Sequence, residues 1–221
     1  MTIQQAMQAR HSVRAYEDRA IEPELREKLQ AELAACNEAG GLNMKLVFDE
    51  PKAFSAFMAR YGKFSGVRNY VVVAGKKADD LNERAGYWGE KFVLAAQSLG
   101  LNTCWVALTY SKVSSAFTVA AGEKLCAVIA IGYGKTQGVP HRSKAMEKVT
   151  KTDGPAPDWF TAGVEAALLA PTAMNQQKFQ FTLAEDKVSV RAGMGFYTKI
   201  DLGIVRYHFE AGAGREHFTW A

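Results

Sequence analysis

The sequence contains little that would place the protein among secreted, disulfide-stabilised or membrane proteins. Its 221 residues include only three cysteines, Cys36, Cys104 and Cys126, and this odd number without paired spacing argues against a disulfide framework. The N-terminus has no apolar core of a signal peptide, and no apolar run is long enough to span a bilayer. We therefore expect a cytoplasmic protein that makes no membrane contact.

The familiar catalytic and metal-binding motifs are also missing. The chain has no HExxH, no P-loop and no Gly-x-Gly-x-x-Gly after a strand. Its four histidines are scattered, and His208 lies on an apolar helix, which is typical of a packing residue rather than a base. We expect no metal site and no catalytic side chain, so any redox or transfer chemistry would come from a bound cofactor.

Charge and composition exclude two further classes. The net charge is +4, from 27 basic and 23 acidic residues, and no basic run interleaves with aromatics, so a nucleic-acid partner is not expected. This mild excess suits small anionic ligands such as phosphates. Because 48% of the residues are hydrophobic, the chain can bury a core and is not globally disordered.

Hydrophobic periodicity predicts an α+β fold with a central mixed or antiparallel sheet flanked by helices. Residues 51–66 are expected to be helical first and a loop later. Helices are expected at 3–9, 22–41, 79–102, 158–170 and 200–216, and strands at 44–48, 68–76, 103–110, 126–134 and, as a hairpin, 178–193. The helix around 79–99 is expected at the centre. Its Gly86 and Gly89 indicate close approach by a flat ligand or another backbone, or simply tight helix packing.

The stretch "KTDGPAPDW" has the proline and glycine content of a linker, and we place a boundary there, between units 1–150 and 151–221. The second unit would be shorter and packed on the first. "AACNEAGGLNMKLVF" and "AALLAPTAMNQQKFQF" share one order of helix end, small-residue turn, asparagine and strand. This echo predicts an internal duplication, although chance could also produce it.

Two stretches carry basic side chains at close spacing. In "RHSVR", an extended segment would point Arg10, Ser12 and Arg14 to one side, where guanidinium groups and a hydroxyl can hold a phosphate. "PHRSKAM" offers Arg142 and Lys144 in a basic loop. Each cluster is also compatible with a solvated basic segment, and the spacing alone does not establish that the two meet.

The stretch "APTAMNQQ" presents an uncharged hydrogen-bonding set late in the chain. It comprises the Thr172 hydroxyl, the Asn175 and Gln177 amides, and the backbone around Pro171. Amides pair donors with acceptors, which suits the edge of a planar heterocycle. The alternative is an ordinary helix C-terminus whose amides close backbone hydrogen bonds.

Together these stretches resemble the nitroreductase-type flavoprotein superfamily. The likeness covers most of the chain and rests on "RHSVRAY", "APTAMNQQKFQF", "GYWGEKFVLAAQSLGLNTCWVAL", "AVIAIGYG" and "PHRSKAMEKV". More narrowly, the chain resembles a branch in which one chain holds two half-size units. Ordinary members place the proline-asparagine turn after the first helices, where this chain has "EAGGLNMK". They are dimers with each flavin between subunits, so this chain, as monomer or homodimer, would hold both walls of one site.

The resemblance implies FMN as cofactor and NAD(P)H as electron donor. It implies that Arg10, Ser12 and Arg14 hold the FMN phosphate and ribityl side, with Arg14 near the N1/O2 edge of the ring. The other implied FMN contacts are Arg142 and Lys144 at the phosphate, Pro171, Thr172, Asn175 and Gln177 at the ring and ribityl chain, the backbone of Leu108 and Thr109 near N5 and O4, Lys63 at the ring edge, and the His11 backbone.

The implied reaction has ping-pong order. The nicotinamide delivers hydride and leaves, and a small-molecule acceptor such as a nitroaromatic, a quinone or another flavin takes its place. The sequence leaves the choice between NADH and NADPH open. Two other readings stay open: a non-catalytic flavin or small-molecule binding protein on the same fold, and a partner-binding domain whose basic clusters are merely solvated.

Overall fold

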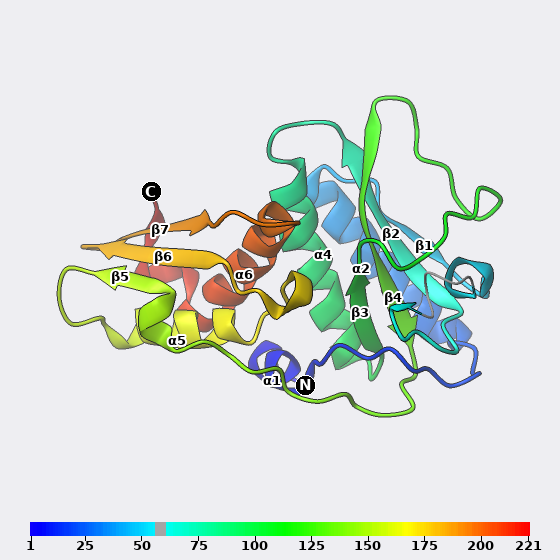
Figure 1. The fold of residues 1–221 in the computed structure, drawn as a ribbon, viewed down its shortest axis with the longest axis horizontal. Coiled ribbons are helices and arrows are strands. Elements are labelled where there is room, and N and C mark those ends of the chain that lie inside the picture. The colour runs from blue at the N-terminus through cyan, green and yellow to red at the C-terminus, as the bar shows by residue number, and fades with distance from the viewer. Residues whose placement is uncertain (56–60) are drawn as a thin grey trace.

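Two four-stranded sheets lie on either side of a central pair of helices in the computed structural model, which describes residues 1–55 and 61–221 (Figure 1). The helices are α1 (Ile3–Ala9), α2 (Pro23–Gly40), α4 (Leu81–Ser98), α5 (Asp158–Leu168) and α6 (Thr198–Ala213). The strands are β1 (Lys45–Val47), β2 (Asn69–Lys76), β3 (Asn102–Val106), β4 (Glu123–Gly132), β5 (Thr150–Thr152), β6 (Phe179–Ala184), β7 (Lys187–Ala192) and β8 (Thr219–Trp220). The predicted α+β class is confirmed, and β5 and β8 are too short for a periodic signal.

The first sheet has the order β1-β2-β4-β3, with antiparallel neighbours throughout. The nearly continuous apolar run of β4 is buried between β2 and β3, as expected for an inner strand. The "RHSVRAY" segment runs along the outer edge of β3, where the Val13 amide donates to the Thr103 carbonyl at 3.0 Å. The edge of β3 therefore fixes the position of this segment.

The second sheet has the order β5-β6-β7-β8. β6 and β7 form the predicted antiparallel hairpin, while β5 is parallel to β6 and β8 is parallel to β7. The second sheet begins with Thr150, one residue before the boundary expected from the sequence. Of the region 51–66, residues 52–54 form a single 3-10 turn, and residues 56–60 lie outside the described residues.

Helices α4 and α6 are in backbone contact at glycines. A Cβ atom added to Gly86 would lie 2.1 Å from the carbonyl oxygen of Ile200, and one added to Gly203 would lie 2.0 Å from that of Glu83. Gly89 faces the indole ring of Trp105 at a similarly short distance. The glycines of α4 therefore serve tight protein packing rather than a flat ligand, and α4 is the buried central helix that the sequence predicts.

All three cysteines lie in the core. Cys36, Cys104 and Cys126 are free thiols and all are buried, and burial raises the pKa of each. Over residues 1–55 and 61–221, no helix is both long and apolar enough to cross a membrane. The same residues contain no cluster of three or more His, Cys, Asp or Glu side chains that could hold a metal ion.

Candidate functional site

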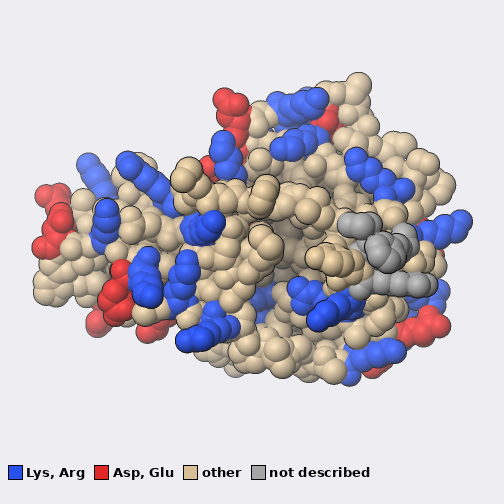
Figure 2. Space-filling view, in the orientation of Figure 1, with Lys and Arg blue, Asp and Glu red and all other residues tan. Residues whose placement is uncertain are grey.

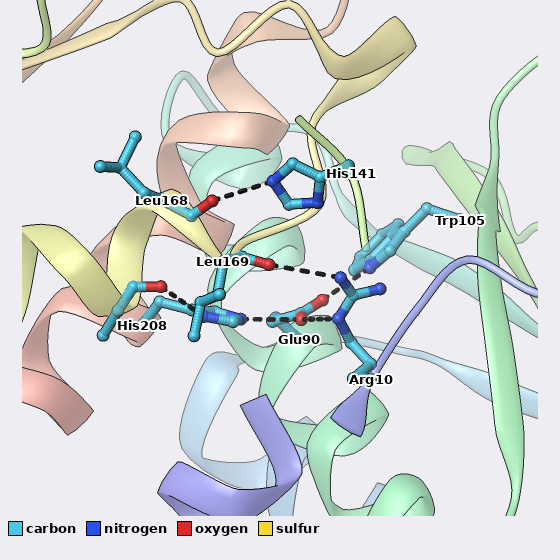
Figure 3. Close-up of polar contacts among 8 residues, drawn as sticks. Arg10, Glu90, Trp105, His141, Leu168, Leu169 and His208 are labelled. Carbon is cyan, nitrogen blue, oxygen red and sulfur yellow. Dashed lines mark hydrogen bonds and ion pairs between the residues drawn. The ribbon is translucent and has the colours of Figure 1, made fainter. Parts of the chain in front are cut away.

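Arg10 follows the last residue of α1 and its side chain is only 3% exposed (Figure 3). Its Nη2 donates to the Leu169 carbonyl at 3.3 Å, and its Nε lies 3.7 Å from Glu90 Oε1. Burial lowers the pKa of Arg10, and the Glu90 carboxylate opposes this shift. Arg10, Ser12 and Arg14 all lie near the Cys104 thiol, as expected for side chains on one side of the segment, but Arg10 is buried against Glu90 whereas Ser12 and Arg14 are exposed.

Glu90 is the centre of a buried polar network that joins both halves of the chain (Figure 3). Its carboxylate accepts hydrogen bonds from Trp105 Nε1 at 2.8 Å and faces His208 Nε2 at 3.0 Å. His208 Nδ1 lies 3.0 Å from the Ala166 carbonyl, which can only accept, so Nδ1 carries a proton. The interpretation of His208 as a satisfied packing residue is confirmed, since both ring nitrogens have partners.

The end of α5 brings the two basic stretches together. Its last carbonyls have no partner within the helix, and three side chains satisfy them. Leu168 O accepts from Ser143 Oγ at 3.0 Å and lies 2.9 Å from His141 Nε2, next to the Leu169 carbonyl that Arg10 contacts. The "PHRSKAM" loop and the "RHSVR" segment, more than a hundred residues apart, therefore meet at one helix end.

His11 lies close to this junction. A Cβ atom added to Gly138 would be 2.7 Å from the His11 Cβ, so the loop before "PHRSKAM" packs against His11. Partial burial, and then the Arg10 charge, lower the pKa of His11. Burial and the same charge lower the pKa of His141, against the hydrogen bond to Leu168.

The "PHRSKAM" loop is also tied to the "APTAMNQQ" turn. The Asn175 and Gln177 amides both donate to the Arg142 carbonyl at 2.9 Å. Gln177 Oε1 accepts from the Lys144 amide, and the Lys144 ammonium donates to the carbonyls of Gln176 and Gln177, all at 2.8 Å. Lys144 thus holds the turn, whereas the Arg142 side chain is exposed.

The turn itself has an unusual backbone. Met174, Asn175 and Gln177 have positive φ angles of 51°, 52° and 45°, a region that costs side-chain-bearing residues energy. Asp201, in the first turn of α6, accepts from the Ala173 amide at 2.9 Å and from Gln176 Nε2 at 2.7 Å. Thr172 Oγ1 accepts from the Gln177 amide at 3.1 Å. These bonds compensate the cost of a shape that presents Met174 and Asn175 to solvent.

A second group of predicted residues gathers at the far end of "RHSVR". The Arg14 carbonyl accepts from the Ser65 amide at 3.0 Å, and the Arg14 guanidinium lies 5.9 Å from the Phe64 ring centroid. Lys63 precedes that ring with a φ of 60°, and a Cβ atom on Gly62 would lie 2.5 Å from Thr109 Oγ1. Arg14, Lys63 and Thr109 are therefore neighbours.

Figure 2 shows a hollow near the middle of this face of the molecule. The segment before α6 is joined to the "APTAMNQQ" turn, because Gln176 Nε2 donates to the Phe196 carbonyl at 2.8 Å. Three large apolar side chains near the predicted site residues in the sequence are exposed: Leu108 at 67%, Met174 at 82% and Phe196 at 76%. Lys and Arg atoms lie along the hollow, and Asp and Glu atoms lie toward the ends and outer edges of this face.

Sequence reasoning missed the residues that shape this site from within. Glu90, Asp201, His141 and Ser143 carry the contacts described above, yet none was singled out as a site residue, although His141 and Ser143 lie within "PHRSKAM" and Glu90 within "GYWGEKF". An acidic residue inside the apolar face of the helix around 79–99 was the available signal for Glu90, because a buried carboxylate requires a partner. Asp201, near the start of α6, looks like an ordinary first-turn acid in the sequence.

Comparison with known proteins places the chain in a family. A sequence profile described as "Putative TM nitroreductase" matches residues 2–213. No curated protein matches the sequence. Solved structures resemble it in fold, one of them a "putative nitroreductase" from Thermotoga maritima, with 20% identity, a TM-score of 0.68, and coverage of 96% of this chain and 83% of that one.

Two further structures match about two thirds of the chain. One is a "putative nitroreductase in complex with FMN" from Desulfovibrio desulfuricans, with 22% identity, a TM-score of 0.55, and coverage of 71% of this chain and 99% of that one. The other is a "putative NADH dehydrogenase/NAD(P)H nitroreductase" from Bacteroides thetaiotaomicron, with 23% identity, a TM-score of 0.53, and coverage of 66% and 95%. With the profile spanning nearly its whole length, the chain belongs to the nitroreductase family described as "Putative TM nitroreductase".

Proposed function

We propose that the chain is an FMN-dependent oxidoreductase that binds its flavin in the hollow between "RHSVR" and the "APTAMNQQ" turn. The observation that carries this proposal is that "RHSVR" and "PHRSKAM" both bond to the end of α5, directly before the "APTAMNQQ" turn, through Arg10 with Leu169 and Ser143 with Leu168. Residues about 160 positions apart are thereby in contact. The Desulfovibrio structure of the same fold was solved with FMN, which supports the choice of cofactor.

The donors at one end of the hollow suit a phosphate. Ser12 and Arg142 are exposed there, and an exposed guanidinium can hold phosphate oxygens in a bidentate way. The buried Nε of Arg10 has no hydrogen-bond partner among the described residues. Arg10 and Lys144 would act mainly by fixing the surrounding backbone, since their charged groups already contact carbonyl oxygens.

The other end suits a flat heterocycle. Arg14 and Lys63 supply positive charge beside the Leu108–Thr109 segment, whose backbone amides are the expected partners of the ring. Asn175 and Thr172 would contact the ring and ribityl chain from the opposite wall, with Pro171 behind them. Leu108 and Met174 are apolar and exposed, and covering such surface favours binding of a planar ring system.

When bound, FMN would accept hydride from NAD(P)H and pass electrons to a small acceptor such as a nitroaromatic or a quinone, in ping-pong order. The chain orients the reactants, supplies positive charge at the ring edge and limits the access of water. No side chain is assigned as an acid or a base. The exchange of donor and acceptor on one ring face needs an open hollow, and the exposed rim residues leave it open.

The visible absorption spectrum of the purified protein tests flavin binding. Arg10→Ala would disturb the buried network, so the exposed Arg14 and Arg142 are better probes. We expect oxidised-flavin bands in the wild type, and loss of most bound flavin in the Arg14→Ala, Arg142→Ala double variant. Arg191→Ala, an exposed arginine on β7, is the matched control and should keep its flavin. A wild-type protein that stays colourless with added FMN would refute the proposal.

Turnover separates an enzyme from a flavin-binding protein on the same fold. The flavin-loaded protein should oxidise NADH or NADPH faster when a nitroaromatic or a quinone is added. Parallel lines in double-reciprocal plots would support ping-pong order. Bound flavin without any oxidation of either donor would favour the non-catalytic binding protein instead.

We also propose that residues 1–150 and 151–221 are two related units. Among the α-helices and strands of residues 1–55 and 61–221, the order helix, strand, strand, helix, strand occurs twice, as α2-β1-β2-α4-β3 and α5-β6-β7-α6-β8. Gly86 contacts Ile200 and Ile204, and Gly203 contacts Glu83 and Tyr87, so each helix offers the other an equivalent glycine. All three matched pairs are separated by 117 residues (203 − 86, 200 − 83, 204 − 87). Such a reciprocal contact is typical of a two-fold relation.

A further inference from the structure

A second concavity opens beside the proposed flavin site. It has a volume of about 580 Å³ and lies between the end of β3, the start of β4 and the start of α6. Ala107 and Tyr110 form one wall and Gly195 and Tyr197 the other. The first wall brackets the Leu108–Thr109 segment, and the second is joined to the turn through Gln176. The pocket therefore adjoins both the Leu108–Thr109 segment and the "APTAMNQQ" turn.

Three lysines line this pocket, and no Asp or Glu does. They are Lys112 in the loop after β3, Lys124 on β4 and Lys199 on α6, and all three are exposed. Lys124 donates to Asn82 Oδ1 at 3.3 Å, and none of the three forms an ion pair within residues 1–55 and 61–221. A concavity lined by charges of one sign concentrates the field and attracts ions of the other sign. The ligand expected here is a polyanion.

The start of α6 adds to this field. The preceding residue, Tyr197, has a φ of 60° and makes no side-chain cap, so the first amides of the helix lack a side-chain acceptor. Thr198 and Lys199, the first two residues of α6, line the pocket. Asp201, the nearest acid on this helix, accepts from Ala173 and Gln176 instead. The helix end therefore reinforces the three ammonium groups for an anion, as phosphates require.

We propose that this pocket binds the phosphate groups of the electron-donating nicotinamide dinucleotide, and that it favours the 2′-phosphorylated form, NADPH. The inference rests on the proposed function, because it needs a nicotinamide above the flavin ring. A dinucleotide whose nicotinamide lies over Leu108–Thr109 extends naturally into the adjoining pocket. NADPH carries one more phosphate than NADH, and three lysines offer more partners than a diphosphate alone uses.

The test compares two donors that share the dihydronicotinamide ring and differ in phosphate. We use NADPH and 1-benzyl-1,4-dihydronicotinamide, which has no phosphate, with the wild type and the Lys112→Met, Lys199→Met double variant. The KM for NADPH should rise about tenfold or more, as expected for the loss of charge-assisted contacts. The KM for the benzyl compound should not change. The control Lys151→Met, on β5, should match the wild type with both donors.

Equilibrium binding gives a readout that does not depend on turnover. Calorimetric titration with adenosine 2′,5′-bisphosphate should show binding to the wild type and to Lys151→Met, and little or none to the double variant. Added salt should weaken that binding, because counterions screen exposed lysines.

The failures can be told apart. Normal oxidation of both donors by the double variant, with an unchanged KM for NADPH, would overturn this inference and leave the proposed function intact. An equal rise of KM for both donors would also overturn it, since the lysines would then act on the ring site. Absence of flavin-dependent oxidation of either donor by the wild type would overturn the proposed function, and this inference with it.

Discussion

At the scale of single residues, two glycines set how closely the central helices approach. Gly203 in α6 lies against the backbone of α4 at Glu83 and Tyr87. Gly86 in α4 lies against the backbone of α6 at Ile200 and Ile204. A methyl group has no room at either position, because the neighbouring atoms belong to helical backbone and not to a flexible side chain. The separation of the two helices in turn places Glu90 against His208 and Asp201 beside the turn.

We predict that Gly203→Ala destabilises the fold by about 2–3 kcal/mol or more, as overpacking in a rigid interface does. The added Cβ would lie 2.0 Å from the Glu83 carbonyl oxygen. Urea unfolding measures the change. Gly154→Ala is the matched control, because its Cβ would meet nothing within 4 Å, and it should be neutral or slightly stabilising. Equal effects of the two substitutions would show that the helices can separate without cost.

Single residues also mark what the sequence could and could not predict. It identified Gly86 as a point of close approach, but not Gly203 as the partner, because the two glycines lie 117 positions apart in the chain. Arg10 was recognised as important, but its burial against Glu90 could not be predicted, because Glu90 lies 80 positions later in the chain. Local spacing predicts the chemistry of a side chain, whereas its direction depends on partners from distant elements.

At the scale of elements, the Glu90 network links α1, α4, α5, α6 and β3. We predict that Glu90→Gln costs about 3–5 kcal/mol in the free energy of unfolding, since it leaves the buried Arg10 charge without its anion. Urea unfolding followed by circular dichroism measures this. Glu165→Gln on α5 removes an exposed carboxylate and should cause no measurable change. If Glu90→Gln changed the free energy of unfolding as little as that control, the charge of Glu90 would not contribute to stability.

The contact between α6 and the turn should respond to pH. Burial raises the pKa of Asp201 to about 6, against its hydrogen bonds to Ala173 and Gln176. An acid with a raised pKa stabilises the folded state fully below its unfolded value, 3.8, and this stability is lost as pH rises through about 6. The full change corresponds to about 3 kcal/mol, at 1.36 kcal/mol per unit.

Asp201→Asn tests this linkage. The free energy of unfolding of the wild type should fall, relative to the variant, between about pH 4 and about pH 7. The difference in slope is diagnostic, because the asparagine changes the bond to Gln176 at every pH. The same titration of Asp158→Asn, at the exposed start of α5, provides a control. Parallel pH profiles for wild type and Asp201→Asn would assign the pH dependence to other groups.

At the scale of the whole molecule, the α+β class, the long helices and the order of the main strands could be predicted from periodicity. The division into two sheets could not be predicted. The edge strands of the second sheet, β5 and β8, are very short and pair with strands that are remote in sequence. The same limit applies to the site. Its two walls could be named from "RHSVR" and "APTAMNQQ", but the end of α5 that joins them, at Leu168 and Leu169, carries no polar side chain.

This joining within one chain leads to the last prediction, on stoichiometry. Arg10 and Ser143 from the first unit contact the carbonyls that precede the turn of the second, so both walls belong to one chain. A monomer should therefore retain one FMN per chain when any dimer is diluted apart. Size-exclusion chromatography with light scattering and absorbance, over a series of dilutions, measures mass and flavin together. If a dimer forms, the flavin-to-protein ratio should stay constant while the measured mass falls on dilution. If no dimer forms, the ratio should be the same at all concentrations. If flavin is lost as the dimer dissociates, a partner subunit must complete the flavin site. A single chain would then not hold both walls of that site.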